Sequence, residues 1–172
     1  AIPFLASIGG ATRFYLQEVR PDFKLYATPL QIDPANPALP LSTPSDWASD
    51  LSHNIGRFYT QELPEDTDAY QDGIFTAREF WEQSQFIYEE RQRALDFMLD
   101  SFDEGFLFFY FSSVDQGSHM LHHFSDSGHP AFVDDEFLAV GMQTLYEEMD
   151  ESLGRVLETM EEQENTTLIV MS

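Results

Sequence analysis

The chain has 172 residues and a formal net charge of −23, from 31 acidic and 8 basic residues, and it contains no cysteine. This charge argues against a nucleic-acid polymer or an anionic membrane surface as a partner, because either would repel the protein. Without cysteine, disulfides and thiolate metal sites are excluded. Aromatic residues make up 15% of the sequence, which is typical of a folded chain of about one domain. No apolar run approaches the ~20 residues of a membrane span.

The first 45 residues are predicted to form a β-rich or extended segment. Residues 12–19 and 23–30 are rich in β-favouring side chains and are separated by a short turn-forming stretch with a proline. That pattern is typical of a hairpin or a meander. Residues 31–44 carry several prolines, so we expect an extended loop there and not a helix.

The remainder of the chain, residues 46–172, is predicted to be a helical and α/β portion. Its first helix is expected to begin with Thr43 as the N-cap, followed by a proline in the first turn. An apolar stripe then supports the helix, and Gly56 marks its predicted end. The stripe consists of Trp47, Leu51 and Ile55.

Two longer helices are predicted further along. Thr76 and Glu79 form the pattern of a capping box, which predicts a helix from residue 76 to about residue 102. A second helix is predicted over residues 134–162, because apolar side chains recur there at spacings of three and four. That stripe consists of Leu138, Met142, Leu145, Met149, Leu153, Val156 and Met160. We interpret its methionines as core residues and not as metal ligands.

A run of six apolar or aromatic residues, 106–111, lies between these two helices. A run without alternation is typical of a strand buried on both faces, as in the middle of a parallel sheet. Residues 168–171 form a second strand candidate after the last helix. The order helix, strand, loop, helix, strand predicts parallel pairing through a right-handed crossover. The predicted fold class is therefore α/β, with parallel strands flanked by long helices.

Asp115 and His119 follow directly after the first of these strands. The carboxyl ends of the strands in an open α/β sheet are where ligands and metals collect. A carboxylate and an imidazole four residues apart can converge on one cation, on a helical turn or in a tight loop at Gly117. The alternative is that Asp115 caps a helix and His119 is a hydrogen-bonded, partly buried residue.

Other histidines crowd the same region and leave further alternatives open. His123 stands four residues after His119, so Asp115, His119 and His123 in a row on one helix are a second candidate for a zinc site. We rank this three-residue site below the Asp115–His119 pair. His129 precedes a proline and is interpreted as a loop constraint or a contact on the substrate side.

The stretch from Phe106 to His119 resembles the metal motif of the alkaline phosphatase superfamily, in its type I phosphodiesterase/nucleotide pyrophosphatase branch. In that branch a buried strand ends in Asp-x-x-x-His, and both residues bind one of two metal ions. Residues 166–172 resemble the strand that runs into Ser-Asp-His-Gly, and the chain ends at that serine. Residues 13–16 and 25–34 are similar to an insertion of bacterial members.

The resemblance implies a partial alkaline-phosphatase-like fold and a metal-dependent phosphohydrolase or phosphodiesterase with two divalent ions, zinc or else manganese. Its substrate would be a small phosphate ester or a nucleotide. Asp115 and His119 would supply half of one ligand set. The nucleophile of this family, a Ser or Thr at a helix N-terminus, has no match in the chain, and the upstream Asp ligand has none either. We therefore expect an internal fragment, truncated before Asp-His-Gly and inactive by itself, with no catalytic residue to assign.

Two other functions remain open at this point. The charge of −23 suits a non-catalytic, acidic cation-binding module. An interaction or structural domain with incidental histidines is the third reading. The oligomeric state does not follow from the sequence.

Overall fold

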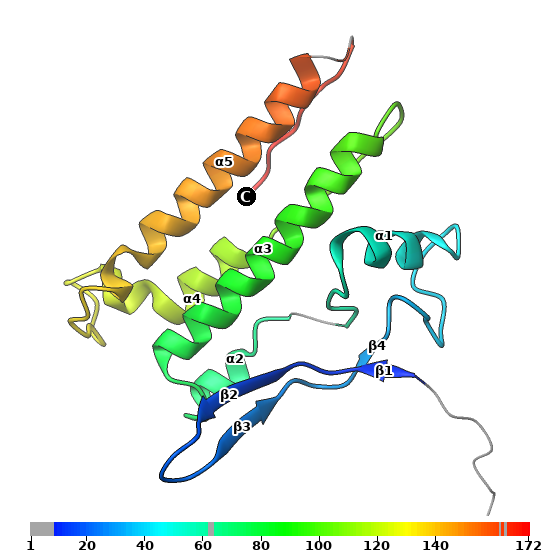
Figure 1. Ribbon diagram of the computed structural model, residues 1–172. Helices are drawn as coiled ribbons and strands as arrows, with labels where there is room; N and C mark the ends of the chain where they lie inside the picture. Colours follow the sequence, from blue (N-terminus) through cyan, green and yellow to red (C-terminus); the bar gives the residue numbers. More distant parts are fainter. Residues whose placement is uncertain (1–8, 62–63, 162, 164) are drawn as a thin grey trace, which may run out of the picture. The chain divides into compact units, whose positions relative to one another are not determined.

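The computed structural model describes residues 9–61, 64–161, 163 and 165–172 of this mixed α/β chain. The chain divides into two compact units, residues 1–64 and residues 65–172. Figure 1 shows the course of the chain through both units. Of the predicted N-terminal segment, residues 1–45, the part from residue 9 onward is described and lies within the first unit, whereas residues 1–8 lie outside the described residues. The first unit also contains the first helix.

The first unit is built on two short antiparallel pairs of strands. Strand β2 (Phe14–Glu18) pairs with β3 (Lys24–Ala27), and β1 (Gly10–Ala11) pairs with β4 (Gln31–Ile32). The β2–β3 pair is the hairpin that the sequence predicts for residues 12–30. Both sheets have two strands, and all of their residues except Gln31 are exposed or only partly buried.

Helix α1 (Trp47–Ile55) follows in the first unit and begins later than predicted. Its first turn is held by the Ser42 hydroxyl, which accepts a hydrogen bond from the Ala48 amide at 3.0 Å, and not by Thr43. Gly56 ends the helix as expected, with a φ of 90° that favours glycine.

The second unit is helical. Its elements are α2 (Thr67–Gln71), α3 (Ala77–Ser101), α4 (Ser113–Ser125), the 3-10 turn η1 (Leu138–Val140) and α5 (Gly141–Glu161). Helix α4 packs against α3, η1 and α5 (Figure 1). The side chains at the centre of this packing are at most 2% exposed, namely Phe80, Ile87, Leu121, Leu138 and Leu145. None of the described helices is long and apolar enough to cross a membrane.

The observed bounds of the two long helices agree with the predicted bounds, except at the start of the last helix. The capping box at the start of α3 is confirmed, because Thr76 and Glu79 exchange the two expected hydrogen bonds. The predicted start of the last helix at residue 134 is wrong. Asp135 instead accepts hydrogen bonds from the amides of Phe137 and Leu138 at 2.9 and 3.1 Å, so the helical turns begin only at Leu138.

Neither of the two predicted strands forms in the described structure, and the described residues contain no parallel sheet. Residues 106–111 are irregular, with alternating exposure: Phe106, Phe108 and Tyr110 are exposed, whereas the residues between them are partly buried. Residues 168–171 are exposed as well. Residues 103–111 make no backbone–backbone hydrogen bond to another described residue, and a strand requires a hydrogen-bonded neighbour.

Candidate metal centre

Helix α4 carries both residues of the predicted metal site, one helical turn apart on its outer face. The Oδ1 atom of Asp115 lies 3.4 Å from the Nε2 atom of His119. The two side chains are 53% and 70% exposed, so both can be reached from solvent. Of the geometries that the sequence allows, the structure has the helical turn, because residues four apart on a helix lie on the same face.

The opposite face of α4 fixes the helix on its neighbours. Leu121 and Phe124 are buried there, and so is Gly117. A Cβ atom at Gly117 would lie 2.2 Å from the Cδ1 atom of Leu145 on α5, so the absence of a side chain allows the two helices to approach closely. The glycine between Asp115 and His119 thus serves helix packing and does not form a tight loop.

Gln116 orients the carboxylate of Asp115. It is 7% exposed, and its Nε2 atom donates a hydrogen bond to Asp115 Oδ2 at 3.0 Å. The other carboxylate oxygen, Oδ1, is the one that faces His119. Hydrogen bonds to the outer oxygen of a ligating carboxylate are a common means of holding it in position.

The separation of the two polar atoms suits a shared ion. Two ligands at about 2.1 Å from a tetrahedral zinc ion lie about 3.4 Å from each other. Asp115 Oδ1 and His119 Nε2 are 3.4 Å apart. The donor set, one carboxylate oxygen and one imidazole nitrogen, is also of the type that zinc accepts. The pair fits two positions of such an ion, while the described part of the chain has no group of three His, Asp or Glu side chains that could hold one.

The competing three-residue site is not assembled. His123 lies instead beside Phe124 and His129, with ring centroids 4.1 and 6.2 Å away. Burial lowers the pKa of His123, and the nearby His129 lowers it further. The Nδ1 atom of His129 accepts a hydrogen bond from the Ala131 amide at 3.1 Å, which is the role of a loop constraint.

Sequence reasoning missed a second aspartate–histidine pair, at the carboxyl end of α4, where Asp126 directly follows the helix. His122 Nε2 lies 3.8 Å from Asp126 Oδ2, and both side chains are about half exposed. The spacing of four residues is the same as between Asp115 and His119, so the signal was present in the sequence. The midpoints of the two pairs are seven residues apart, which corresponds to about 10 Å along a helix. The two pairs therefore cannot hold the two ions of one two-metal centre, which lie about 4 Å apart.

Glu65 is the other residue that the sequence did not indicate. It is 2% exposed, and its Oε1 atom accepts a hydrogen bond from the Ser112 hydroxyl at 2.6 Å. Ser112 is the residue that precedes α4. Residue 65 lies in a polar, acidic stretch whose composition predicts a loop. No apolar periodicity in this stretch predicts a buried residue.

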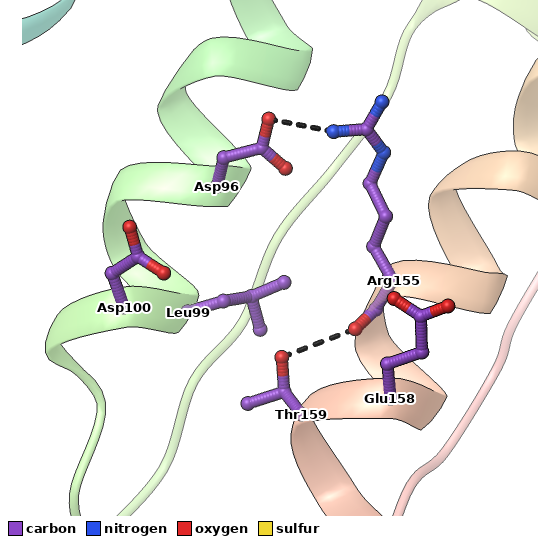
Figure 2. Close-up of a pocket in the computed structure, with 6 residues that line it drawn as sticks. All are labelled: Asp96, Leu99, Asp100, Arg155, Glu158 and Thr159. Atoms are coloured by element: carbon purple, nitrogen blue, oxygen red, sulfur yellow. Dashed lines mark hydrogen bonds and ion pairs between the residues drawn. The ribbon is translucent and has the colours of Figure 1, made fainter.

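An open pocket lies away from α4, between α3 and α5 (Figure 2). It is lined by Asp96, Leu99, Asp100, Arg155, Glu158 and Thr159. Arg155 is paired there with Asp96 at 2.9 Å, and its carbonyl accepts a hydrogen bond from the Thr159 hydroxyl. None of its residues belongs to the Asp115–His119 pair, so the pocket and the metal-site candidate are separate features.

Comparison of the chain with protein-family models, curated proteins and solved structures gives no match. The assignment of a metal site therefore depends on the sequence pattern and on the geometry of α4.

Proposed function

We propose that this chain is the part of a metal-dependent phosphohydrolase or phosphodiesterase that contributes Asp115 and His119 to one of two divalent metal ions. The observation that carries the proposal is the 3.4 Å separation of Asp115 Oδ1 and His119 Nε2 on the exposed face of a well-packed helix. Zinc suits this ligand pair best, and manganese is the alternative. The substrate would be a small phosphate ester or a nucleotide.

We also propose that residues 106–111 and 168–171, which are irregular in this structure, become strands of a parallel sheet when segments other than the described ones complete it. Their apolar side chains support this, since Phe106 and Ile169 are 87% and 73% exposed. Several large apolar side chains that are exposed within one short segment are typical of a surface that another segment covers. The alternating exposure of residues 106–111 is the pattern of a strand with one face covered.

The two ions would neutralise charge on the transferred phosphoryl group and activate a nucleophile. This chain contributes the placement of one carboxylate and one imidazole, with Gln116 orienting the carboxylate. It offers no matched nucleophile, and its net charge of −23 would repel a phosphate ester that no metal ion screens. We therefore expect no hydrolysis of p-nitrophenyl phosphate or bis-p-nitrophenyl phosphate by the chain alone, with zinc or manganese added.

Calorimetric titration with zinc and manganese tests the proposal. Wild-type protein should bind weakly, because two ligands leave most of the coordination sphere to water. Asp115→Ala or His119→Ala should lower the affinity about tenfold or more, which corresponds to the loss of roughly 1.4 kcal/mol. The His122–Asp126 pair provides a matched control, since it has the same spacing and similar exposure.

The control distinguishes zinc binding at a specific site from general attraction of zinc ions to an acidic surface. Asp126→Ala should leave the zinc affinity within about twofold of the wild-type value, a change of roughly 0.4 kcal/mol. Equal losses for Asp115→Ala and Asp126→Ala, or no zinc binding by the wild type, would contradict the proposal.

A non-catalytic cation-binding module is the second candidate, and the charge of −23 favours it. Such a module would bind calcium through many carboxylates, because calcium prefers oxygen ligands in larger number. Its signature is calcium binding that Asp115→Ala does not change. The same titration series, repeated with calcium, distinguishes this module from the phosphohydrolase half-site.

A further inference from the structure

Glu65 is the acidic residue whose burial the fold explains least. Only 2% of it is exposed, and its Oε1 atom accepts a 2.6 Å hydrogen bond from Ser112, 47 residues later in the chain. The Oε2 atom is also buried and has no hydrogen-bond partner among the residues that the structure describes. Burying a carboxyl group that is only half satisfied is unfavourable, so its retention calls for a reason.

The neighbour of Glu65 fixes its position. The Asp66 amide donates a hydrogen bond to Gln83 Oε1 on α3 at 2.9 Å. The Asp66 side chain caps α2 by accepting from the Ala69 amide at 2.8 Å. These bonds attach the chain at residues 65 and 66 to α2 and α3. They therefore hold the carboxylate of Glu65 in place as an acceptor for the Ser112 hydroxyl.

That acceptor holds the start of α4. Ser112 precedes the helix, yet its hydroxyl does not cap the helix in the usual way and is donated to Glu65 instead. The Ser112 carbonyl accepts the first helical hydrogen bond, from the Gln116 amide at 2.9 Å. Gln116 in turn orients Asp115. A carboxyl group at the amino end of a helix is also favoured by the helix dipole.

We propose that Glu65 is a positioning residue, which anchors the first turn of α4 through Ser112 and thereby sets Asp115 against His119. The role of the anchor in metal binding rests on the proposed function, whereas the anchor itself is a property of the fold. The bond from Ser112 to Glu65 joins the start of α4 to the segment before α2, which the Asp66 amide attaches to α3, so it restrains the helix that carries both metal-ligand candidates.

Amide hydrogen exchange followed by NMR tests the anchor. Ser112→Ala and Glu65→Ala should each speed exchange of the Gln116 amide about tenfold relative to the amides of α3, because a buried hydrogen bond is lost at that end of the helix. Glu65→Gln keeps one acceptor oxygen and should restore slow exchange. Should Glu65→Ala not fold, Ser112→Ala still provides the measurement.

Ser152 supplies a matched control. It is 4% exposed and donates a 2.6 Å hydrogen bond to Gln92 Oε1 at the α3–α5 contact, away from the start of α4. Ser152→Ala should lower overall stability without selective exchange at Gln116. A Gln116 amide that is equally protected in Ser112→Ala and Ser152→Ala overturns the inference.

Zinc titration of the same variants separates positioning from a merely structural role. Under conditions where all variants are folded, Ser112→Ala and Glu65→Ala should weaken zinc binding at least about threefold, and Ser152→Ala should not. If the wild type binds zinc through Asp115, and Ser112→Ala and Glu65→Ala bind zinc with unchanged affinity, the positioning role is overturned. Absence of zinc binding by the wild type would overturn the proposed function and the positioning role, while the exchange result would still decide the anchor.

Discussion

The two kinds of apolar segment in the second unit have opposite surroundings. Phe80 on α3 is fully buried and stacks on Tyr70, with ring centroids 5.3 Å apart. Phe106, which follows α3 in the same unit, is 87% exposed. The residue type is identical, and both positions belong to strongly apolar patterns in the sequence. The difference lies in the secondary structure that each pattern requires.

A helix satisfies its own backbone hydrogen bonds and needs a neighbour only for its apolar stripe. A strand needs a neighbour for its backbone as well. Helices α3, α4 and α5 supply one another with that apolar contact. Residues 106–111 have no strand beside them among the described residues, and therefore they stay irregular and half exposed.

The largest expected effect comes from truncating the same side chain in the two regions. Phe80→Ala should lower the free energy of unfolding by about 3–5 kcal/mol, because it removes a fully buried ring and leaves a cavity. Phe106→Ala should change it by no more than about 0.5 kcal/mol, since little of that ring is buried. Urea unfolding measured for both variants gives the two values directly. Similar losses would mean that residues 106–111 are covered in solution.

Two glycines, Gly117 on α4 and Gly154 on α5, allow a tightly packed and an open helical position to be compared within the helical region. Gly117→Ala should destabilise the protein by about 1–3 kcal/mol, because its new Cβ atom would overlap the Cδ1 atom of Leu145, a buried side chain that would have to shift within the core. Gly154→Ala is the control on α5, where a Cβ atom would meet nothing within 4 Å. It should stabilise by about 0.5–1 kcal/mol through helix propensity. Thermal unfolding distinguishes the two signs, and a stabilising Gly117→Ala would refute the close α4–α5 approach.

The helical part of the fold could be predicted because its signals are local. The capping box at Thr76 and Glu79 marks the start of α3 to within one residue. The late starts of α1 and α5 could not be predicted, since they depend on which side chain reaches back to cap the helix. Ahead of α5 that side chain is Asp135, which caps the 3-10 turn η1 through the Leu138 amide and is also paired with Arg78 on α3 at 2.9 Å. A contact between residues 57 positions apart cannot be recognised in the local sequence pattern.

The candidate site also has a part that could be predicted from local sequence and a part that depends on packing. The spacing of Asp115 and His119 places both on one helical face, so their proximity follows from the sequence once α4 is a helix. The orienting role of Gln116 and the bond from Glu65 to Ser112 do not follow, because they depend on the side of α4 that packing buries. Hydrophobic patterning predicts burial of apolar residues and cannot indicate which acidic residue is buried with them.

The smallest expected effect concerns Glu148, a partly buried carboxyl group on α5 within the helical region. Burial raises its pKa above the ordinary value of 4.5, the charges of Glu151 and Glu89 raise it further, and a hydrogen bond from Gln85 opposes the shift. Because the folded-state pKa lies above the unfolded-state value, the unfolded chain loses this proton first as the pH rises. Stability therefore falls as the pH rises from 4.5 to the folded-state pKa, and then stays lower.

Glu148→Gln removes this pH-dependent penalty. Its stability relative to the wild type should increase between pH 4 and pH 7, by less than the effects expected at Phe80 and Gly117. Glu147→Gln is the control for the general loss of one negative charge, because Glu147 is exposed on the same helix. Urea unfolding of the three proteins at both pH values provides the comparison. A gain for Glu148→Gln that is the same at both pH values, or that Glu147→Gln equals, would show that Glu148 is as well solvated in the α3–α5 contact as a surface carboxylate.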